Sequence, residues 1–241
     1  CGTASGMSAI MSAVDPLLVK QKEGPERINF VSCVQVYGGT FQQFSIRKMQ
    51  ERGIECRWVQ HPWDIEEWKS KIDDETRFIF MEMPSNPQQS FTDIKALADA
   101  AHAREVPLIV DATCATPALM RPIAYGADIV VHSLTKSITS GGFAIGGALI
   151  SRKPITTKVQ NDHPLFKDSY AEYVKFLPYR DNGPASAPVN AQGFGCGFRA
   201  GGSRNSTGSI VWPNRPSERT ITGMRYWSAR SNAWNVKSSI S

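Results

Sequence analysis

Several short apolar runs without polar alternation are the feature that most constrains the fold of this chain. Three of them are RFIFMEM, PLIVD and ADIVVH, at residues 77–83, 107–111 and 127–132. Runs of this kind are typical of parallel strands that are covered on both faces. Segments with helical spacing lie between them. Strands that alternate with helices predict an α/β fold with a mainly parallel sheet.

The remaining elements are predicted from the same two periods. Further strands are expected at residues 28–32, 55–59 and 147–151, and helices at residues 5–20, about 40–52, 64–72 and 93–104, with a possible short helix at 165–177. Ser5 is a plausible cap for the first helix, and Pro16 is expected to end or kink it. Gly53 suits the position just after a helix end.

Lys136 follows one of the apolar runs and stands between hydroxyl residues and a glycine-rich segment. Asp111 ends another run, and ligands of such sheets bind at the carboxyl ends of the strands. An amine for a Schiff base, hydroxyls for a phosphate and a carboxylate for a pyridinium nitrogen are the parts of a pyridoxal phosphate (PLP) site. The alternative is an ordinary surface lysine in a turn, because lysine is rarely buried.

Six motifs in order resemble the Cys/Met-metabolism family of PLP-dependent enzymes, which includes cystathionine synthases and lyases, methionine gamma-lyase and O-acetylhomoserine sulfhydrylase. The motifs are SGM (5–7), YGGT (37–40), EMPSNP (82–87), VDATCATP (110–117), GADIVVHSLTK (126–136) and IGG (145–147). The resemblance covers about residues 1–190. It implies the large domain of the fold type I PLP-dependent transferases, a mainly parallel sheet with helices on both faces.

The resemblance also implies roles for single residues. Lys136 would form the Schiff base and move protons, and Tyr37 would stack on the cofactor ring and take part in proton transfer. Asp111 would pair with the pyridine nitrogen, and Asn86 would contact the phenolic oxygen of the cofactor. The phosphate would be held by four residues, which are Gly6, Met7, Ser133 and Thr135. An ordinary structural role remains the alternative for each of these residues, such as turn capping for Ser133 and Thr135.

Two neighbouring residues invite a catalytic interpretation that we do not adopt. His132 precedes Ser133, and alternation along the strand points its side chain away from that of Ser133, so we expect a packed histidine. Cys114 lies near Asp111 without a histidine partner in the sequence, so we do not interpret it as a nucleophile.

The resemblance implies PLP-dependent sulfur amino-acid metabolism (transsulfuration), with gamma-replacement or elimination on a homoserine-ester or cystathionine-like substrate. The segment GGFAIGG is closer to the sulfhydrylase branch than to the lyase branch. Family members are homodimers or homotetramers with shared active sites and small amino-acid substrates. The alternative is an incomplete, catalytically inactive PLP-binding remnant or an interaction protein. A dinucleotide-binding module is excluded because no GxGxxG follows the first strand.

Composition narrows the possible partners and compartment. Residues 191–241 hold seven of the 27 basic and one of the 22 acidic residues, which leaves 20 and 21 for the first 190. The net charge of residues 1–190 is therefore close to zero, and we do not expect this part of the chain to bind nucleic acid. No run of about 18 apolar residues predicts a membrane span, and no signal peptide is recognised. The five cysteines have no CxxC spacing, so free thiols in a reducing cytoplasm are expected, with neither a metal site nor a disulfide framework.

The last segment differs from the rest of the chain. Residues 191–241 contain no leucine, seven glycines and nine serines, and no helical or strand period persists. We therefore predict a PLP-binding large domain at residues 1–190 and an irregular or disordered tail at 191–241. A natural tail and a frame-shifted or truncated sequence both explain this composition. The small C-terminal domain of the family is apparently missing, as is the Tyr-x-Arg segment that precedes its first motif, so the domain is expected to be N-terminally truncated.

Overall fold

The computed structural model describes residues 1–19, 27–139, 143–175, 177, 203–204 and 210–211. The chain divides into two units, Cys1–Gly201 and Gly202–Ser241. In the second unit the described residues form a two-stranded antiparallel ladder of β8 (Ser203–Arg204) and β9 (Ile210–Val211). The predicted boundary at residue 190, and the rest of the predicted irregular or frame-shifted tail, lie outside the described residues.

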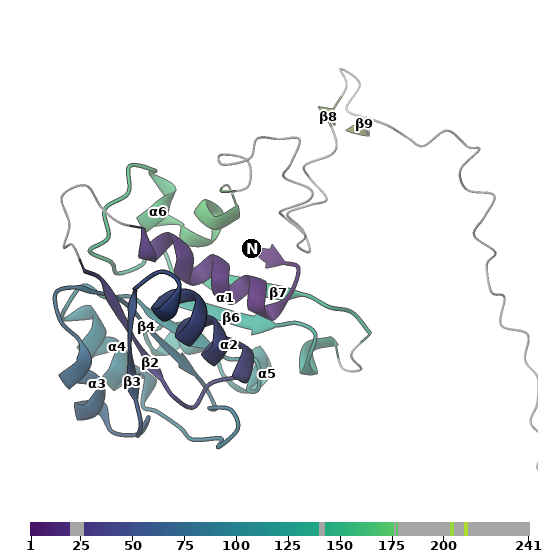
Figure 1. The fold of residues 1–241 in the computed structure, drawn as a ribbon. Coiled ribbons are helices and arrows are strands. Elements are labelled where there is room, and N and C mark those ends of the chain that lie inside the picture. Colours follow the sequence, from purple (N-terminus) through teal and green to yellow (C-terminus); the bar gives the residue numbers. More distant parts are fainter. Residues whose placement is uncertain (20–26, 140–142, 176, 178–202, 205–209, 212–241) are drawn as a thin grey trace, which may run out of the picture. The chain divides into compact units, whose positions relative to one another are not determined.

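The first unit is built on a seven-stranded mixed sheet with the order β1-β7-β6-β5-β4-β2-β3 (Figure 1). The strands are β1 (Gly2–Thr3), β2 (Asn29–Cys33), β3 (Glu55–Val59), β4 (Thr76–Glu82), β5 (Leu108–Asp111), β6 (Ile129–Ser133) and β7 (Gly147–Ser151). Strands β2 to β6 are parallel, and β7 and β1 are antiparallel additions at one edge. All six predicted strands are present with bounds within two residues. The two-residue strand β1 is too short for a period to predict it.

The direction in which strands are added reverses between β2 and β4. The chain passes from β2 to β3 at one edge, returns to β4 on the other side of β2, and continues to β5 and β6. In open α/β sheets a ligand binds at such a reversal, outside the carboxyl ends of the strands. The topology therefore marks the segments after β2 and β4 as parts of a site.

The helices predicted from the sequence are present. The helices of the unit are α1 (Gly6–Val14), η1 (Asp15–Leu18), α2 (Gly38–Gln42), the π-helical η2 (Gln43–Gln50), α3 (Ile65–Lys71), α4 (Ile94–His102), α5 (Thr116–Leu119), η3 (Pro122–Tyr125), η4 (Ser137–Thr139) and α6 (Leu165–Asp168). Three short helices that were not predicted, α5, η3 and η4, lie after β5 and β6. Residues 170–175 are also helical. Helix α1 contacts α2, whereas α3 contacts α4. Right-handed crossovers in opposite directions place these two pairs on opposite faces of the sheet.

The start and end of α1 follow from single residues. The Ser5 Oγ accepts a hydrogen bond from the Ser8 amide at 3.1 Å and so caps the helix. The α-helix ends at Val14, and Pro16 lies in the tighter 3₁₀ turn that follows. Both predictions are confirmed. The predicted helix after Tyr37 is present to residue 50, but most of it winds as a π-helix.

Aromatic side chains fill the core between η2 and the sheet. The ring centroids of Phe30 and Phe78 lie 4.7 Å apart in a stacked pair. Phe44 of η2 contacts Phe80 edge-on, with centroids 5.2 Å apart. All four rings are buried. This cluster holds η2 and, with it, the turn at Tyr37 against the carboxyl half of β4.

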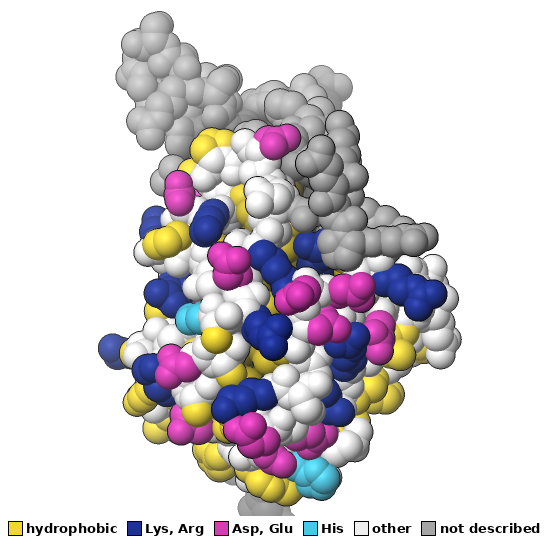
Figure 2. Space-filling model, turned by 90° about the vertical axis from the view of Figure 1, so that its left-hand side faces the viewer, with side chains coloured by type: hydrophobic (Ala, Val, Ile, Leu, Met, Phe, Trp, Pro, Cys, Tyr) yellow, Lys and Arg dark blue, Asp and Glu magenta, His cyan; other side chains and the backbone are white. Residues whose placement is uncertain are grey.

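On the molecular surface, basic and acidic side chains are interspersed over the face drawn in Figure 2. No helix in the described part of the chain is long and apolar enough to cross a membrane. The described cysteines are free, with Cys33 and Cys56 buried and Cys114 exposed. Among the described residues, no group of three or more His, Cys, Asp or Glu side chains could hold a metal ion.

Candidate active site

A cavity of about 470 Å³ lies where the strands β4, β5 and β6 end. This volume is in the range of pockets that bind small molecules. The eight residues singled out in the sequence all line it: Gly6, Met7, Tyr37, Asn86, Asp111, Ser133, Thr135 and Lys136. Residues that are separated by up to 130 positions in the chain are thus brought to one place by the parallel sheet.

The start of α1 supplies hydrogen-bond donors to the cavity. The amides of Gly6 and Met7 are in the first helical turn, where backbone donors have no partner within the helix. A Cβ at Gly6 would lie 2.5 Å from the Cβ of Ser133, so only glycine allows the helix to approach the end of β6 this closely. Free amides at the positive end of a nine-residue helix favour an anionic group such as a phosphate.

The hydroxyl of Thr135 is already engaged. Its Oγ1 accepts a hydrogen bond from the Gly146 amide at 3.1 Å and donates to the Gly146 carbonyl at 3.3 Å. It therefore ties the segment after β6 to the segment before β7. Donation to a phosphate would require this hydroxyl to release the Gly146 carbonyl, because a hydroxyl carries one hydrogen.

Asp111 stands at the end of β5 and is oriented by a neighbour. Its Oδ1 accepts hydrogen bonds from the amide and the hydroxyl of Thr113, at 2.9 and 2.5 Å. The Thr113 Oγ1 in turn accepts from the Ser133 amide at 2.8 Å. Burial raises the pKa of Asp111, and the two bonds from Thr113 oppose this shift. Thr113 was missed in the sequence, where it reads as an ordinary turn residue.

Glu82 is a second carboxyl group in the wall of the cavity. It is the last residue of β4, lies in register with Asp111 on β5, and is 6% exposed. Burial, together with the charge of Asp111, raises its pKa to about 8, although a hydrogen bond from the Tyr37 amide opposes the shift. Its signal in the sequence is a glutamate that continues a strand buried on both faces.

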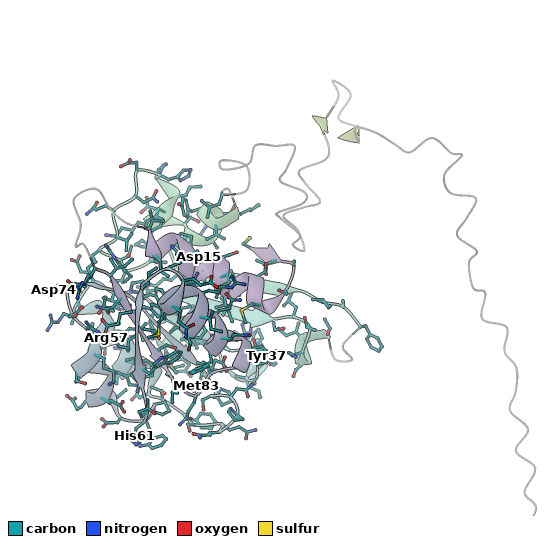
Figure 3. All side chains as sticks on the ribbon, in the orientation of Figure 1. Asp15, Tyr37, Arg57, His61, Asp74 and Met83 are labelled. Atoms are coloured by element: carbon teal, nitrogen blue, oxygen red, sulfur yellow. The ribbon has the colours of Figure 1, made fainter. Side chains whose placement is uncertain are left out.

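Tyr37 lies between β2 and α2, at the rim of the cavity. Its amide donates to the Oε1 of Glu82 at 2.7 Å, and the residue is 51% exposed. A Cβ at Gly39 would lie 2.7 Å from the Cε1 of Tyr37 and 3.1 Å from the Cε of Met7. Figure 3 shows Tyr37 on the opposite side of the unit from Asp74.

Lys136 lines the cavity from the turn after β6 and is exposed. Within the described part of the chain it forms no ion pair, so its amine is not committed to a carboxylate. An exposed amine at the mouth of a cavity can react with a ligand carbonyl that enters it.

His132 and Cys114 differ in their relation to the cavity. His132 is 4% exposed and is not among the lining residues, which confirms the prediction of a packed histidine. Burial lowers its pKa, so the ring is held neutral. Cys114 lines the cavity, but burial and the carboxylates of Glu82 and Asp111 raise the pKa of its thiol, against an opposing effect of Lys136. A protonated thiol is a poor nucleophile.

The cavity therefore has hydrogen-bond donors at one end and carboxyl groups at the other. Following the sheet order, donors from α1 and Ser133 lie at the end of β6, and carboxyl groups lie at the ends of β5 and β4. PLP carries a phosphate anion at one end and a ring nitrogen that binds a proton at the other. The carboxyls whose pKa is raised by burial would be stabilised by a cationic ring nitrogen. The residues present thus fit PLP.

Comparisons with known proteins agree with this chemistry. The family model of the Cys/Met-metabolism PLP-dependent enzymes matches residues 1–228, a longer stretch than the 1–190 covered by the motifs. An O-acetyl-L-homoserine sulfhydrylase of Corynebacterium glutamicum is 37% identical over 187 residues, 76% of this chain and 40% of that protein. O-acetyl-L-homoserine sulfhydrylase 1 of Thermus thermophilus is 41% identical over 180 residues, 68% of this chain and 42% of that protein.

Two solved structures are also similar to this chain. A putative O-acetylhomoserine (thiol)-lyase of Campylobacter jejuni, whose crystal structure contains N'-pyridoxyl-lysine-5'-monophosphate, is similar with a TM-score of 0.55 and 36% identity, over 63% of this chain and 36% of that chain. A cystathionine gamma-lyase of Lactobacillus plantarum in complex with L-serine gives a TM-score of 0.57 at 29% identity, over 63% of this chain and 38% of that chain. The chain spans about two fifths of the length of the curated relatives it matches.

Proposed function

Because the chain belongs to the Cys/Met-metabolism family of PLP-dependent enzymes, we propose that it binds PLP in the cavity at the carboxyl ends of β4, β5 and β6. We further propose that the protein it represents catalyses gamma-replacement on a homoserine ester. The observation that carries the first proposal is the meeting of an uncommitted amine, a helix start, the buried carboxyl of Glu82 and the half-buried carboxyl of Asp111 in one cavity.

Each end of the cofactor has a proposed partner. The amides of Gly6 and Met7, with Ser133 and Thr135, would hold the phosphate. Asp111 would face the ring nitrogen, and Tyr37 one face of the ring. Asn86, which is half-buried in the cavity wall, would contact the phenolic oxygen. Lys136 would bind the aldehyde through its amine.

When bound, PLP supplies an electron sink that stabilises negative charge at carbon α of an amino acid. The chain contributes charge and proton movement. The negative charge of Asp111 favours a proton on the ring nitrogen. The Nζ of Lys136 would take a proton from the substrate and return it to another position, and Tyr37 would assist this transfer at the rim.

The choice of a homoserine ester is supported by the relatives and by one segment of the sequence. Three relatives, 34% to 41% identical, are sulfhydrylases of O-acetyl- or O-succinylhomoserine. The segment GGFAIGG favours the same branch. The predicted homodimer or homotetramer and the predicted cytoplasmic location remain predictions.

A second candidate is a PLP-binding remnant without catalytic activity. The chain spans about two fifths of the length of these relatives, so their catalytic activity is proposed for it and not carried over. Binding of PLP and turnover of substrate must therefore be tested separately.

The first experiment locates the amine. The purified full chain is mixed with PLP, reduced with borohydride, digested and mapped by mass spectrometry. We expect a visible absorbance band before reduction and a pyridoxyl group on the peptide that contains Lys136. Lys136→Ala should lose both signals. Lys95→Ala, which removes an exposed lysine of α4 that pairs with Asp99, should keep both. A label on another peptide would refute the assignment of Lys136.

The second experiment separates the two candidates. The chain loaded with PLP is given O-acetylhomoserine and sulfide, and homocysteine is measured. Formation of homocysteine that depends on Lys136 supports the enzyme. PLP binding without any homocysteine supports the remnant.

A further inference from the structure

Glu82 lies at a position of β4 where the alternation of side chains predicts an apolar residue. Phe78, Phe80 and Glu82 alternate along β4 and therefore share one face of the sheet. The first two pack against Phe44 of η2, with ring centroids 6.4 and 5.2 Å from that of Phe44. A buried carboxyl at the next position is unfavourable unless it has a specific partner.

The partner of Glu82 is the backbone of Tyr37. The Oε1 of Glu82 accepts the Tyr37 amide at 2.7 Å, across 45 positions of the chain. Within the described residues Glu82 forms no ion pair, so this bond is not a side effect of charge pairing. It joins the end of β4 to the segment after β2, at the point where the strand order reverses.

The ring of Tyr37 has few other restraints. The residue is 51% exposed, so burial does not fix it. The absence of a side chain at Gly39 leaves room for the ring, since a Cβ there would lie 2.7 Å from the Cε1 of Tyr37. Gly39 thus permits the position of the ring, whereas the bond to Glu82 holds the backbone that carries it.

From these contacts we infer that Glu82 is a positioning residue, which holds Tyr37 at the rim of the cavity through a hydrogen bond from the Tyr37 amide. The inference rests on the proposed function, in which Tyr37 faces the cofactor ring. If Glu82 only completed the sheet, replacing it would leave the orientation of a bound cofactor unchanged. If Glu82 positions Tyr37, replacing it would change that orientation.

Two substitutions separate the hydrogen bond from the titratable carboxyl. Glu82→Leu fills the same volume approximately and removes the acceptor. Glu82→Gln keeps an oxygen acceptor for the Tyr37 amide and removes the titratable group. Glu66→Leu, at an exposed position of α3, is the matched control.

Three measurements follow the position of Tyr37 in the full chain. Amide hydrogen exchange of Tyr37 is measured without cofactor, and PLP affinity and the circular dichroism induced in bound PLP are measured with it. For Glu82→Leu we expect Tyr37 exchange to rise and PLP affinity to fall by about tenfold each, as for the loss of one hydrogen bond, with an altered induced signal. Glu66→Leu should stay close to the parent in all three, and Glu82→Gln should keep the slow exchange of the Tyr37 amide, because it retains the acceptor.

Several results would overturn the inference. Unchanged exchange and unchanged induced dichroism in Glu82→Leu would do so, as would a Glu82→Gln variant whose Tyr37 amide exchanges as fast as in Glu82→Leu, since the protection would then not depend on the acceptor. If Glu82→Leu does not fold, the parent decides: a Tyr37 amide that exchanges as fast as an amide without a partner refutes the bond, and a strongly protected amide that Glu82→Gln preserves supports it. A parent that binds no PLP overturns the proposed function and this role together, whereas the other outcomes concern Glu82 alone.

Discussion

The carboxyl groups at the two ends of strand β4 have pKa values that are shifted in opposite directions. Asp73 lies just before the amino end of the strand, and Glu82 is its last residue. Burial alone would raise the pKa of Asp73, but hydrogen bonds from Asn29, Arg57 and Thr76 outweigh it and lower the pKa to about 2. At Glu82, burial prevails and the pKa is raised to about 8.

The number of hydrogen bonds to a carboxylate also differs between the two ends of the neighbouring strands. Asp128 precedes β6, has a side chain that is 0% exposed, and accepts the amides of Leu108 and Thr156 at 2.9 and 2.7 Å, with His102 at 2.7 Å. Asp111, at the carboxyl end of β5, receives hydrogen bonds from no described residue other than Thr113, and its pKa is raised. In Figure 3, Asp74, which precedes β4, and Tyr37, which follows β2, lie on opposite sides of the unit.

This difference indicates which end of the sheet serves the fold and which serves a ligand. At the amino end, the chain itself satisfies each of these carboxylates. At the carboxyl end, the carboxyls of Glu82 and Asp111 form no ion pair within the described residues, and a ligand can supply a cationic partner. Functional sites commonly retain groups that lower stability.

The largest effect is expected at Asp111. Asp111→Asn should still bind PLP but should slow hydrogen exchange at carbon α of an added amino acid by about 100-fold or more, because an amide does not hold the proton on the ring nitrogen in the same way. Deuterium incorporation measured by mass spectrometry tests this. Asp99→Asn on α4 is the control. Equal rates in Asp111→Asn and the parent would remove Asp111 from this role.

At Glu82 we expect stability to fall as pH rises, which is the opposite of the pH effect expected at Asp73. The folded-state pKa of Glu82, about 8, lies above the ordinary value of 4.5, so the folded chain holds this proton more tightly than the unfolded chain. The free energy of unfolding should therefore fall as pH rises from about 5 to 8, by on the order of 4 kcal/mol. In Glu82→Gln this fall should be largely absent.

Urea unfolding at several pH values measures the difference between the two proteins. The titratable groups that interact with Glu82 are Asp111 on β5, Cys33 on β2 and Cys114 after β5. They are present in both proteins, as is His132, whose lowered pKa gives the opposite trend below about 6.5. Parallel pH curves for the parent and Glu82→Gln would contradict the raised pKa.

The smallest effect is expected at Asp73. Its lowered pKa means that its contribution to stability is present above its ordinary value of 3.8 and is lost as pH falls through about 2. Asp73→Asn should destabilise the chain at neutral pH by about 1 kcal/mol, a small value because solvent screens a side chain that is 40% exposed. Asp74→Asn, whose side chain is 95% exposed, should have no effect. A difference that persisted at pH 2 would contradict this account.

The sequence alone determined the elements and most of the lining of the cavity. Apolar runs predicted β4, β5 and β6, and the polar residues that end or follow them, Asp111, Ser133 and Lys136, line one cavity as expected. These predictions succeed because the period of burial is local, and because parallel strands bring their carboxyl ends to one edge.

Only the tertiary structure decided how the polar groups of that edge are paired. The bond between Glu82 and the Tyr37 amide, and the bridge of Thr113 between Asp111 and Ser133, join segments that are distant in the chain. The antiparallel pairing of β1 and β7 also has no local signal. Such contacts depend on strand order and register, because a shift of one residue would turn each of these side chains to the other face of the sheet.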